Sequence, residues 1–249
     1  MTKSRAALNH LWPTVLLLVG IAMLVLMTWY PPPFLQFEES GKFSLILILT
    51  AALAGPALTW FVWADGKRGL LMDLSVIVLI QLAAIGWGTL SLFENRPYFM
   101  VYTVDRFEVF SKREVDIGNI PDQRFLDKPL ASPILLFANM PSDQRAFQKF
   151  LQEVMFEGKP DLQFRPEFWS LYSERQHLVA RASRPLEALR SARPASAQAI
   201  DSLVEKNGGD IRQLAFVPGM MRAGHFAAII DANSGELFAR LAIDPWLDQ

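Results

Sequence analysis

The sequence predicts a membrane-anchored α+β protein, with three N-terminal transmembrane helices followed by a periplasmic domain that has a small antiparallel sheet and about three helices. The first observation is that residues 11–28, 45–62 and 74–92 contain no Asp, Glu, Lys or Arg. At ~1.5 Å per residue, each run spans about 27–29 Å of helix, close to the ~30 Å hydrocarbon core of a bilayer. The second is that residues 97–249 mix polar and apolar positions, as a water-exposed domain does.

The composition limits the chemistry available to the chain. Its 249 residues include 24 Lys and Arg against 25 Asp and Glu, which gives a net charge of −1. Since no basic surplus is present to neutralise phosphates, nucleic-acid binding is not expected. The sequence has no cysteine, which excludes disulfides, thiol catalysis and thiolate metal sites.

The apolar runs define the expected domain organisation. Transmembrane spans at about 11–29, 43–63 and 73–93 form an anchor of residues 1–96, which carries a domain of residues 97–249. The first run is longer than the ~7–15-residue apolar core of a signal peptide, and no small-x-small cleavage site follows it. The Trp-Tyr-Pro-Pro-Pro-Phe sequence that follows is typical of a helix ending at the membrane interface. We therefore expect an uncleaved helix.

Charges in the short loops predict the orientation. Lys3 and Arg5 precede the first run, and Lys67 and Arg68 lie in the second loop, whereas the first loop carries two glutamates and one lysine. Basic residues favour the cytoplasmic side, so the amino terminus and the second loop should both be cytoplasmic. Three spans then place residues 97–249 on the opposite side, which is the periplasm if the membrane is a bacterial inner membrane.

The second and third runs carry features that favour helix association in lipid. Each holds a small-xxx-small pair, which lets helices approach closely, and each has one further unusual residue, a proline or a glutamine. In the simpler interpretation these residues pack the three helices together, and Gln81 bonds a carbonyl freed by Pro56. In the other, they form a groove for another protein's transmembrane helix. The contact residues would then be Ala51, Gly55, Pro56, Gln81, Ala84 and Gly88.

The rest of the chain predicts alternating strands and helices. Residues 98–110, rich in β-branched and aromatic side chains, predict a strand or a bent pair of strands, and residues 132–137 predict a short strand. Apolar residues at helical spacing predict helices at 142–157, 167–181 and 195–206.

The carboxyl end predicts antiparallel strands. We expect them at 211–217, 225–231 and 236–243, with the first ending in a turn at Pro218 and Gly219. An Asp-Ala-Asn-Ser-Gly loop joins the last two and supplies the Asn and Gly that positive φ angles need. The sheet is therefore expected to be small and antiparallel.

The sequence offers no catalytic motif. His10 is expected at the cytoplasmic edge of the membrane, and no carboxylate or serine stands at motif spacing to His177 or His225, for which a surface or packing role is favoured. The sequence contains no G-x-S-x-G, H-E-x-x-H, phosphate loop or dinucleotide fingerprint. We therefore expect no catalytic, cofactor-binding or metal-binding residue and no enzymatic activity.

Several short blocks resemble one protein family. They are residues 29–34 (Trp-Tyr-Pro-Pro-Pro-Phe), Gly55-Pro56 with Leu58-Thr59, 72–76 (Met-Asp-Leu-Ser-Val) with Gln81, 104–107 (Val-Asp-Arg-Phe), Ile230-Asp231, Ser234-Gly235-Glu236 and Asp244-Pro245-Trp246. In this order, over nearly the whole chain, they resemble the type IV pilin accessory proteins of the TfpX/TfpZ kind. The blocks are weakly specific one by one and more specific together.

The resemblance implies an inner-membrane protein of type IV pilus biogenesis with no enzymatic activity. It implies that the chain binds or stabilises a cognate major pilin and promotes pilus assembly, and hence twitching motility. The expected partners are that pilin and the lipid bilayer, with the inner-membrane assembly machinery as a further candidate. No cofactor is implied.

Two alternatives belong to other functional classes. A membrane-tethered periplasmic sensor or ligand-binding module, unrelated to pili, would have a defined small-molecule pocket. A pilin-modifying enzyme would cluster acidic residues in a cleft, and the candidates are Asp105, Asp231 and Asp244, of which Asp231 is better explained as a turn residue.

Overall fold

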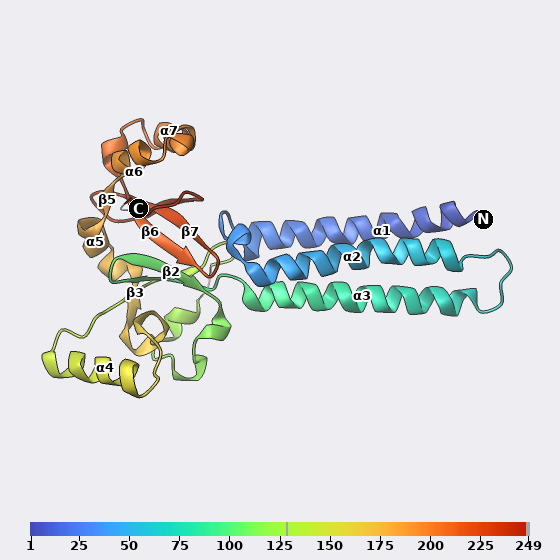
Figure 1. Ribbon diagram of the computed structural model, residues 1–249, viewed down its shortest axis with the longest axis horizontal. Helices are drawn as coiled ribbons and strands as arrows, with labels where there is room; N and C mark the ends of the chain where they lie inside the picture. The colour runs from blue at the N-terminus through green and yellow to red at the C-terminus, as the bar shows by residue number, and fades with distance from the viewer. Residues whose placement is uncertain (128, 248–249) are drawn as a thin grey trace.

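A computed structural model describes residues 1–127 and 129–247 and shows a rod of three long helices joined at one end to a sheet with smaller helices (Figure 1). Helix α1 (Lys3–Leu24) continues through a π-helical turn, η1 (Val25–Trp29). Helices α2 (Glu39–Val62) and α3 (Leu70–Asn95) complete the rod.

The three predicted helices are confirmed, and each is long and apolar enough to cross a membrane. The first begins earlier than its apolar run, because Thr2 caps it by accepting a hydrogen bond from the amide of Arg5. Within the rod, α2 packs against both α1 and α3. The α1–α3 side of the rod is therefore the less closely packed one.

The amino terminus and the α2–α3 loop meet at the end of the rod that lies farthest from the sheet (Figure 1). The terminal amine of Met1 lies 3.4 Å from the carboxylate of Asp65. The indole of Trp63 donates a hydrogen bond to the Met1 carbonyl at 3.0 Å. The basic residues of the second loop and of the amino terminus therefore share one end of the rod, and the sheet lies at the other.

Within the described residues, eight strands form one mixed sheet. They are β1 (Phe99–Thr103), β2 (Arg106–Phe110), β3 (Ile134–Ala138), β4 (Trp169–Leu171), β5 (Arg184–Pro185), β6 (Leu214–Met221), β7 (Gly224–Asp231) and β8 (Leu237–Leu241). Their order is β4-β3-β1-β2-β6-β7-β8, and β5 pairs with β6. The pairs β1–β3 and β2–β6 are parallel, and the other pairs are antiparallel.

The prediction of a small antiparallel sheet is therefore wrong. The hairpins β1–β2 and β6–β7–β8 give local signals, because their strands are joined by short turns. The parallel pairs join segments far apart in the chain, such as Phe107 of β2 and Gly219 of β6, and no turn marks such a pairing.

The prediction of about three helices beside the sheet is also wrong, since the described residues hold α4 (Gln144–Phe156), α5 (Tyr172–Ala182), α6 (Leu186–Ala192) and α7 (Ala197–Lys206). Helix α6 escaped prediction because two turns give too short a periodic pattern. The helix predicted at 167–181 starts later than expected, because its first residues pair with β3 as the edge strand β4.

The predicted turn at Pro218 and Gly219 is wrong as well. Both residues lie inside β6, and the chain reverses at Arg222. Proline is tolerated there because β6 changes neighbours on one side at this point, from β5 at Phe216 to β2 at Gly219. Glycine is required at 219 because the ring of Phe226 occupies the space that a Cβ would need.

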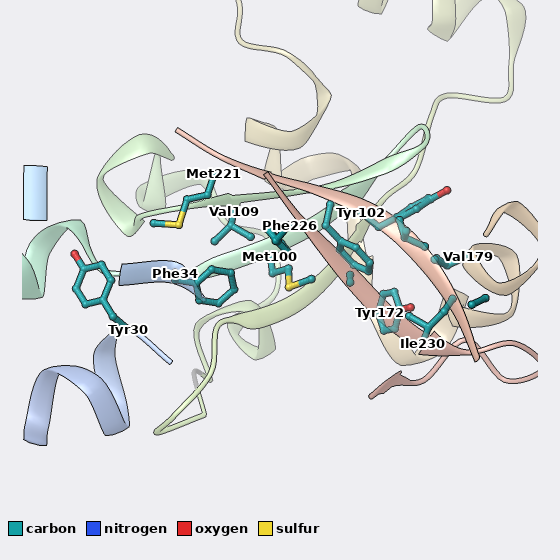
Figure 2. Packing of buried hydrophobic residues seen from close by; sticks show 14 of the residues in the cluster. Tyr30, Phe34, Met100, Tyr102, Val109, Tyr172, Val179, Met221, Phe226 and Ile230 are labelled. Atoms are coloured by element: carbon teal, nitrogen blue, oxygen red, sulfur yellow. The ribbon is translucent and has the colours of Figure 1, made fainter. Parts of the chain in front are cut away.

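Strand alternation buries the two faces of the sheet in different clusters. Met100 and Tyr102 of β1 face a core that includes Tyr172 of α5 (Figure 2). Phe99 and Val101 of the same strand face the opposite core. The first core also receives side chains from the helical rod, so it belongs to both parts of the molecule. The division into domains 1–96 and 97–249 stays a prediction.

The loop between α1 and α2 forms the joint between rod and sheet. The hydroxyl of Tyr30 donates a 3.0 Å hydrogen bond to the carbonyl of Leu92 on α3. The fully buried ring of Phe34 packs edge-on against Phe226 of β7, with centroids 5.5 Å apart (Figure 2). The ring of Phe37 fills the space where a Cβ of residue Gly224 would lie. Three contacts therefore bind the loop to both parts.

An ion-pair cluster closes the joint. Arg222 donates to Glu38 at the start of α2 and to Glu114, both at 2.8 Å, and its guanidinium also reaches the Ser111 hydroxyl at 3.2 Å. Burial alone would lower the pKa of Arg222, but the two carboxylates outweigh it and raise that pKa. The guanidinium therefore stays charged, and it ties the β6–β7 turn to the base of α2.

Replacing Phe34 by alanine should lower the free energy of unfolding by about 3–5 kcal/mol, because it leaves a cavity in the shared core. Phe238→Ala is the matched control, since that ring is 42% exposed and its loss should cost much less. Denaturant unfolding of the detergent-solubilised protein measures both. Equal losses for the two variants would contradict a core that runs through the joint.

Candidate functional site: a polar network and groove in the helical rod

Four polar side chains join the three helices inside the rod. His10 of α1 lies 2.6 Å from the hydroxyl of Thr59 on α2 through Nδ1, and 2.8 Å from Oε1 of Gln81 on α3 through Nε2. The amide of Gln81 donates to the hydroxyl of Thr14 at 3.1 Å, and that hydroxyl donates to the carbonyl of His10 at 3.0 Å. Each of the three helices therefore contributes to one network.

When His10 is neutral, each hydrogen bond of the network can be assigned one donor and one acceptor. Oε1 of Gln81 can only accept, so Nε2 of His10 carries the proton and Nδ1 accepts from Thr59. Gln81 then gives one amide hydrogen to Thr14, and the second has no acceptor within the part of the chain that the structure describes. An ionisable side chain within a membrane-spanning helix is rare, so this cluster is the leading candidate site.

The structure makes His10 part of a network, and its expected place at the membrane edge stays a prediction. Helix α1 begins at Lys3, and ~1.5 Å per residue puts His10 about 10 Å from the start of that helix. Gln81 does not bond a carbonyl freed by Pro56, as the simpler interpretation expected; it bonds His10 and Thr14. His10 and Thr14 are four residues apart, so in a helix that includes both they lie on the same face. This spacing was the available signal, but the expected helix began after His10.

Small residues allow the helices to approach. A Cβ on Gly55 would collide with the amide of Gln81, and one on Gly88 would lie 2.9 Å from a side-chain carbon of Ile48 on α2. Beside Gly88, the hydroxyl of Ser44 donates to that of Ser91 at 3.1 Å. Packing of α2 on α3 through these glycines is confirmed.

The remaining predicted contact residues lie in the same helices. Pro56 is buried, whereas Ala51 and Ala84 are half-buried. The contacts made by Gly55, Gln81 and Gly88 are within this chain. Contact of these six positions with a partner protein stays a prediction.

A groove runs along the rod between α1 and α3. One hollow of about 320 Å³ is lined by His10, Thr14 and Gln81 with apolar neighbours. A second, of about 420 Å³, follows it toward the sheet and ends at Trp29 and Phe93. The two share Leu17, Leu82 and Ile85, so they form one continuous depression, and no residue of α2 lines either of them.

The acidic candidates of the sheet have local structural partners. Asp105 lies 3.4 Å from the guanidinium of its neighbour Arg106. Asp231 accepts from the amides of two residues of its own turn, which lowers its pKa, as expected for a turn residue. Asp244 pairs with Arg193 at 2.7 Å. Among residues 1–127 and 129–247, no group of three or more His, Asp or Glu side chains could hold a metal ion.

The sheet also carries one hollow of note. It measures about 370 Å³ and its lining includes Ser183, Glu187 and Arg212, beside α6. The alternative function of a sensor or ligand-binding module stays a prediction, and this hollow is where its ligand would be sought.

Comparison with known proteins finds relatives of one kind. The chain is 24% identical over 219 residues to the fimbrial assembly protein of serogroup I from Dichelobacter nodosus, covering 86% of this chain and 84% of the relative. It is 23% identical over 230 residues to the serogroup E1 protein of the same organism, covering 90% and 89%. The protein of serogroups C1 and C2 is 29% identical over 105 residues, covering 41% of this chain and 79% of the relative. No family model and no solved structure matches the chain.

Replacing Gly55 by alanine should displace Gln81 and break its bonds to His10 and Thr14. In lipid each such bond contributes roughly 0.6–2 kcal/mol, so we expect a loss of roughly 1–3 kcal/mol in the stability of the rod. Gly86→Ala is the control, because nothing lies within 4 Å of its Cβ position. Unfolding in mixed detergent micelles measures both; a stable Gly55→Ala protein would mean that the network does not hold the helices together.

Proposed function

We propose that the chain is a non-enzymatic inner-membrane accessory protein of type IV pilus biogenesis. In this proposal it binds or stabilises a cognate major pilin and promotes its assembly into the pilus. The carrying observation is the similarity to fimbrial assembly proteins over 84% and 89% of their own lengths. The resemblance to TfpX/TfpZ proteins supports the narrower assignment to pilin accessory proteins.

The architecture suits a partner that is partly in the membrane and partly outside it. The rod offers helices long and apolar enough to cross a bilayer, and the shared core fixes the sheet at one end of them. A pilus subunit awaiting assembly would meet both surfaces if it has a membrane helix and a folded head. We therefore propose a two-part contact, one with the rod and one with the sheet.

The proposed orientation places the amino terminus in the cytoplasm and the sheet in the periplasm. Its support is that Lys3, Arg5, Lys67 and Arg68 gather at the end of the rod that lies farthest from the sheet (Figure 1).

The pilin should co-purify with an affinity-tagged copy of the chain from detergent-solubilised membranes. Deletion of the gene should reduce surface pili and twitching motility, and the wild-type chain should restore both. A strain with a non-cognate pilin is the control, since restoration should depend on the matching pilin. Normal piliation and motility in the deletion strain would contradict a role of this chain in pilus assembly.

Alkaline phosphatase fused after residue 249 should be active, because the enzyme matures only outside the cytoplasm. The same enzyme inserted in the α2–α3 loop, after Gly66, should be inactive. The opposite result, with an inactive phosphatase after residue 249 and an active one after Gly66, would reverse the orientation. It would also exclude action of the sheet on a periplasmic head.

A further inference from the structure

The groove between α1 and α3 is about as long as a bilayer's hydrocarbon core is thick. Its lining on α1 and η1 runs from His10 to Trp29, which is about 28 Å at ~1.5 Å per residue. A lipid belongs to one leaflet, so its acyl chains reach through about half of the ~30 Å hydrocarbon core. A helix that crosses the membrane is the occupant that matches the full length of this groove.

One position in the groove shows unused space. Gly86 of α3 is exposed, lines the groove, and has no atom within 4 Å of its Cβ position. This differs from Gly55 and Gly88, whose space is taken by side chains of this chain. The packing of the rod does not require glycine at 86, whereas close approach of another helix there would.

The end of the groove far from the sheet is polar, and this separates it from an ordinary lipid-facing depression. His10, Thr14 and Gln81 line it, and the second amide hydrogen of Gln81 has no acceptor among the described residues. The hollow between α1 and α2, by contrast, is lined by apolar residues alone, such as Leu18, Leu45 and Leu49. A polar end costs free energy in lipid unless a partner supplies the missing acceptor.

Charge complementarity selects the kind of acceptor. His10 is the one ionisable residue among the side chains that line the two hollows, and it is a base. A carboxylate would accept the free amide hydrogen of Gln81 and would place its negative charge beside the one base of the groove. A carboxylate buried in hydrocarbon in turn needs such donors.

We propose that the α1–α3 groove holds a membrane-spanning helix of the pilus subunit, and that Gln81 donates its second amide hydrogen to an acidic side chain of that helix, which lies beside His10. This inference rests on the proposed function. The acidic side chain lies in the half of the bilayer far from the sheet, at the depth of Gln81. The apolar remainder of the helix passes Gly86 and leaves the groove beside Trp29 and Phe93.

The first test fills the groove. Gly86→Leu should reduce pilin co-purification at least about tenfold, because the new side chain occupies the space of the bound helix. Gly20→Leu is the matched control: it is an exposed helical glycine with nothing within 4 Å of its Cβ position, and it lines neither hollow. We expect co-purification with this control to stay within about twofold of wild type.

The outcomes separate this inference from the proposed function. If pilin co-purifies with the Gly86→Leu variant at the wild-type level, the groove is not the binding site. Capture of pilin by the wild-type chain would still support the accessory role. Failure of the wild-type chain to capture pilin would remove the accessory role itself.

A second test avoids any change in the groove's shape. A photo-crosslinking residue at Leu90, in the groove, should capture pilin, whereas one at Leu53, exposed on α2, should not. Adducts from position 90 to a second copy of this chain, or to lipid alone, would overturn the proposed occupant.

The acidic contact has its own test. His10→Gln keeps a hydrogen-bonding side chain in the network but removes the base, so we expect pilin capture to fall several-fold. Unchanged capture by this variant would overturn pairing with an acid, and neutralising the acidic residue in the pilin's membrane helix should then have no effect either.

Discussion

The packing of Phe34 into the sheet is the contact on which the rest of the structure depends. It comes from a loop of the helical rod, yet it lies fully buried against Phe226 in the main core. Exposing an aromatic side chain of ~150–250 Å² costs roughly 4–6 kcal/mol at ~25 cal/mol per Å². The sheet therefore cannot swing away from the helices at low cost, and the rod and sheet behave as one body.

The ion-pair cluster gives that joint its specificity. Glu38 is fully buried, and a buried carboxylate is stabilised only when a cation and hydrogen bonds replace its hydration. Arg222 meets this need from the β6–β7 turn and reaches Glu114 with its other amino group. A buried ion pair of this kind adds little net stability, but any other docking angle would leave a charge unpaired. The aromatic contact thus supplies the energy, and the charges select one orientation.

The sequence predicted the three helices of the rod well because the feature that marks them is local. A run free of charge is its own signal, whereas the cap at Thr2, which starts α1 before its apolar run, was not predicted. The parallel pairing of β2 with β6 has no such signal, and it decided the form of the sheet. In the site, Gln81 was predicted from its polarity, but His10 was left out, because the charge-free run that marked the first helix begins only after it. Its bond to Gln81 depends on how helices distant in sequence pack together.

The rigid joint links what happens in the groove to what happens at the sheet. Trp29 and Phe93, which end the groove, also line a hollow of about 340 Å³ at the base of the sheet, together with Arg96, Tyr98 and Leu130. The guanidinium of Arg96 lies over the ring of Phe93, so this hollow combines aromatic surface with a positive charge. A helix seated in the groove would leave the membrane directly into it. Since the sheet cannot turn on the rod at low cost, the proposed membrane contact would fix the direction in which a bound subunit presents its head.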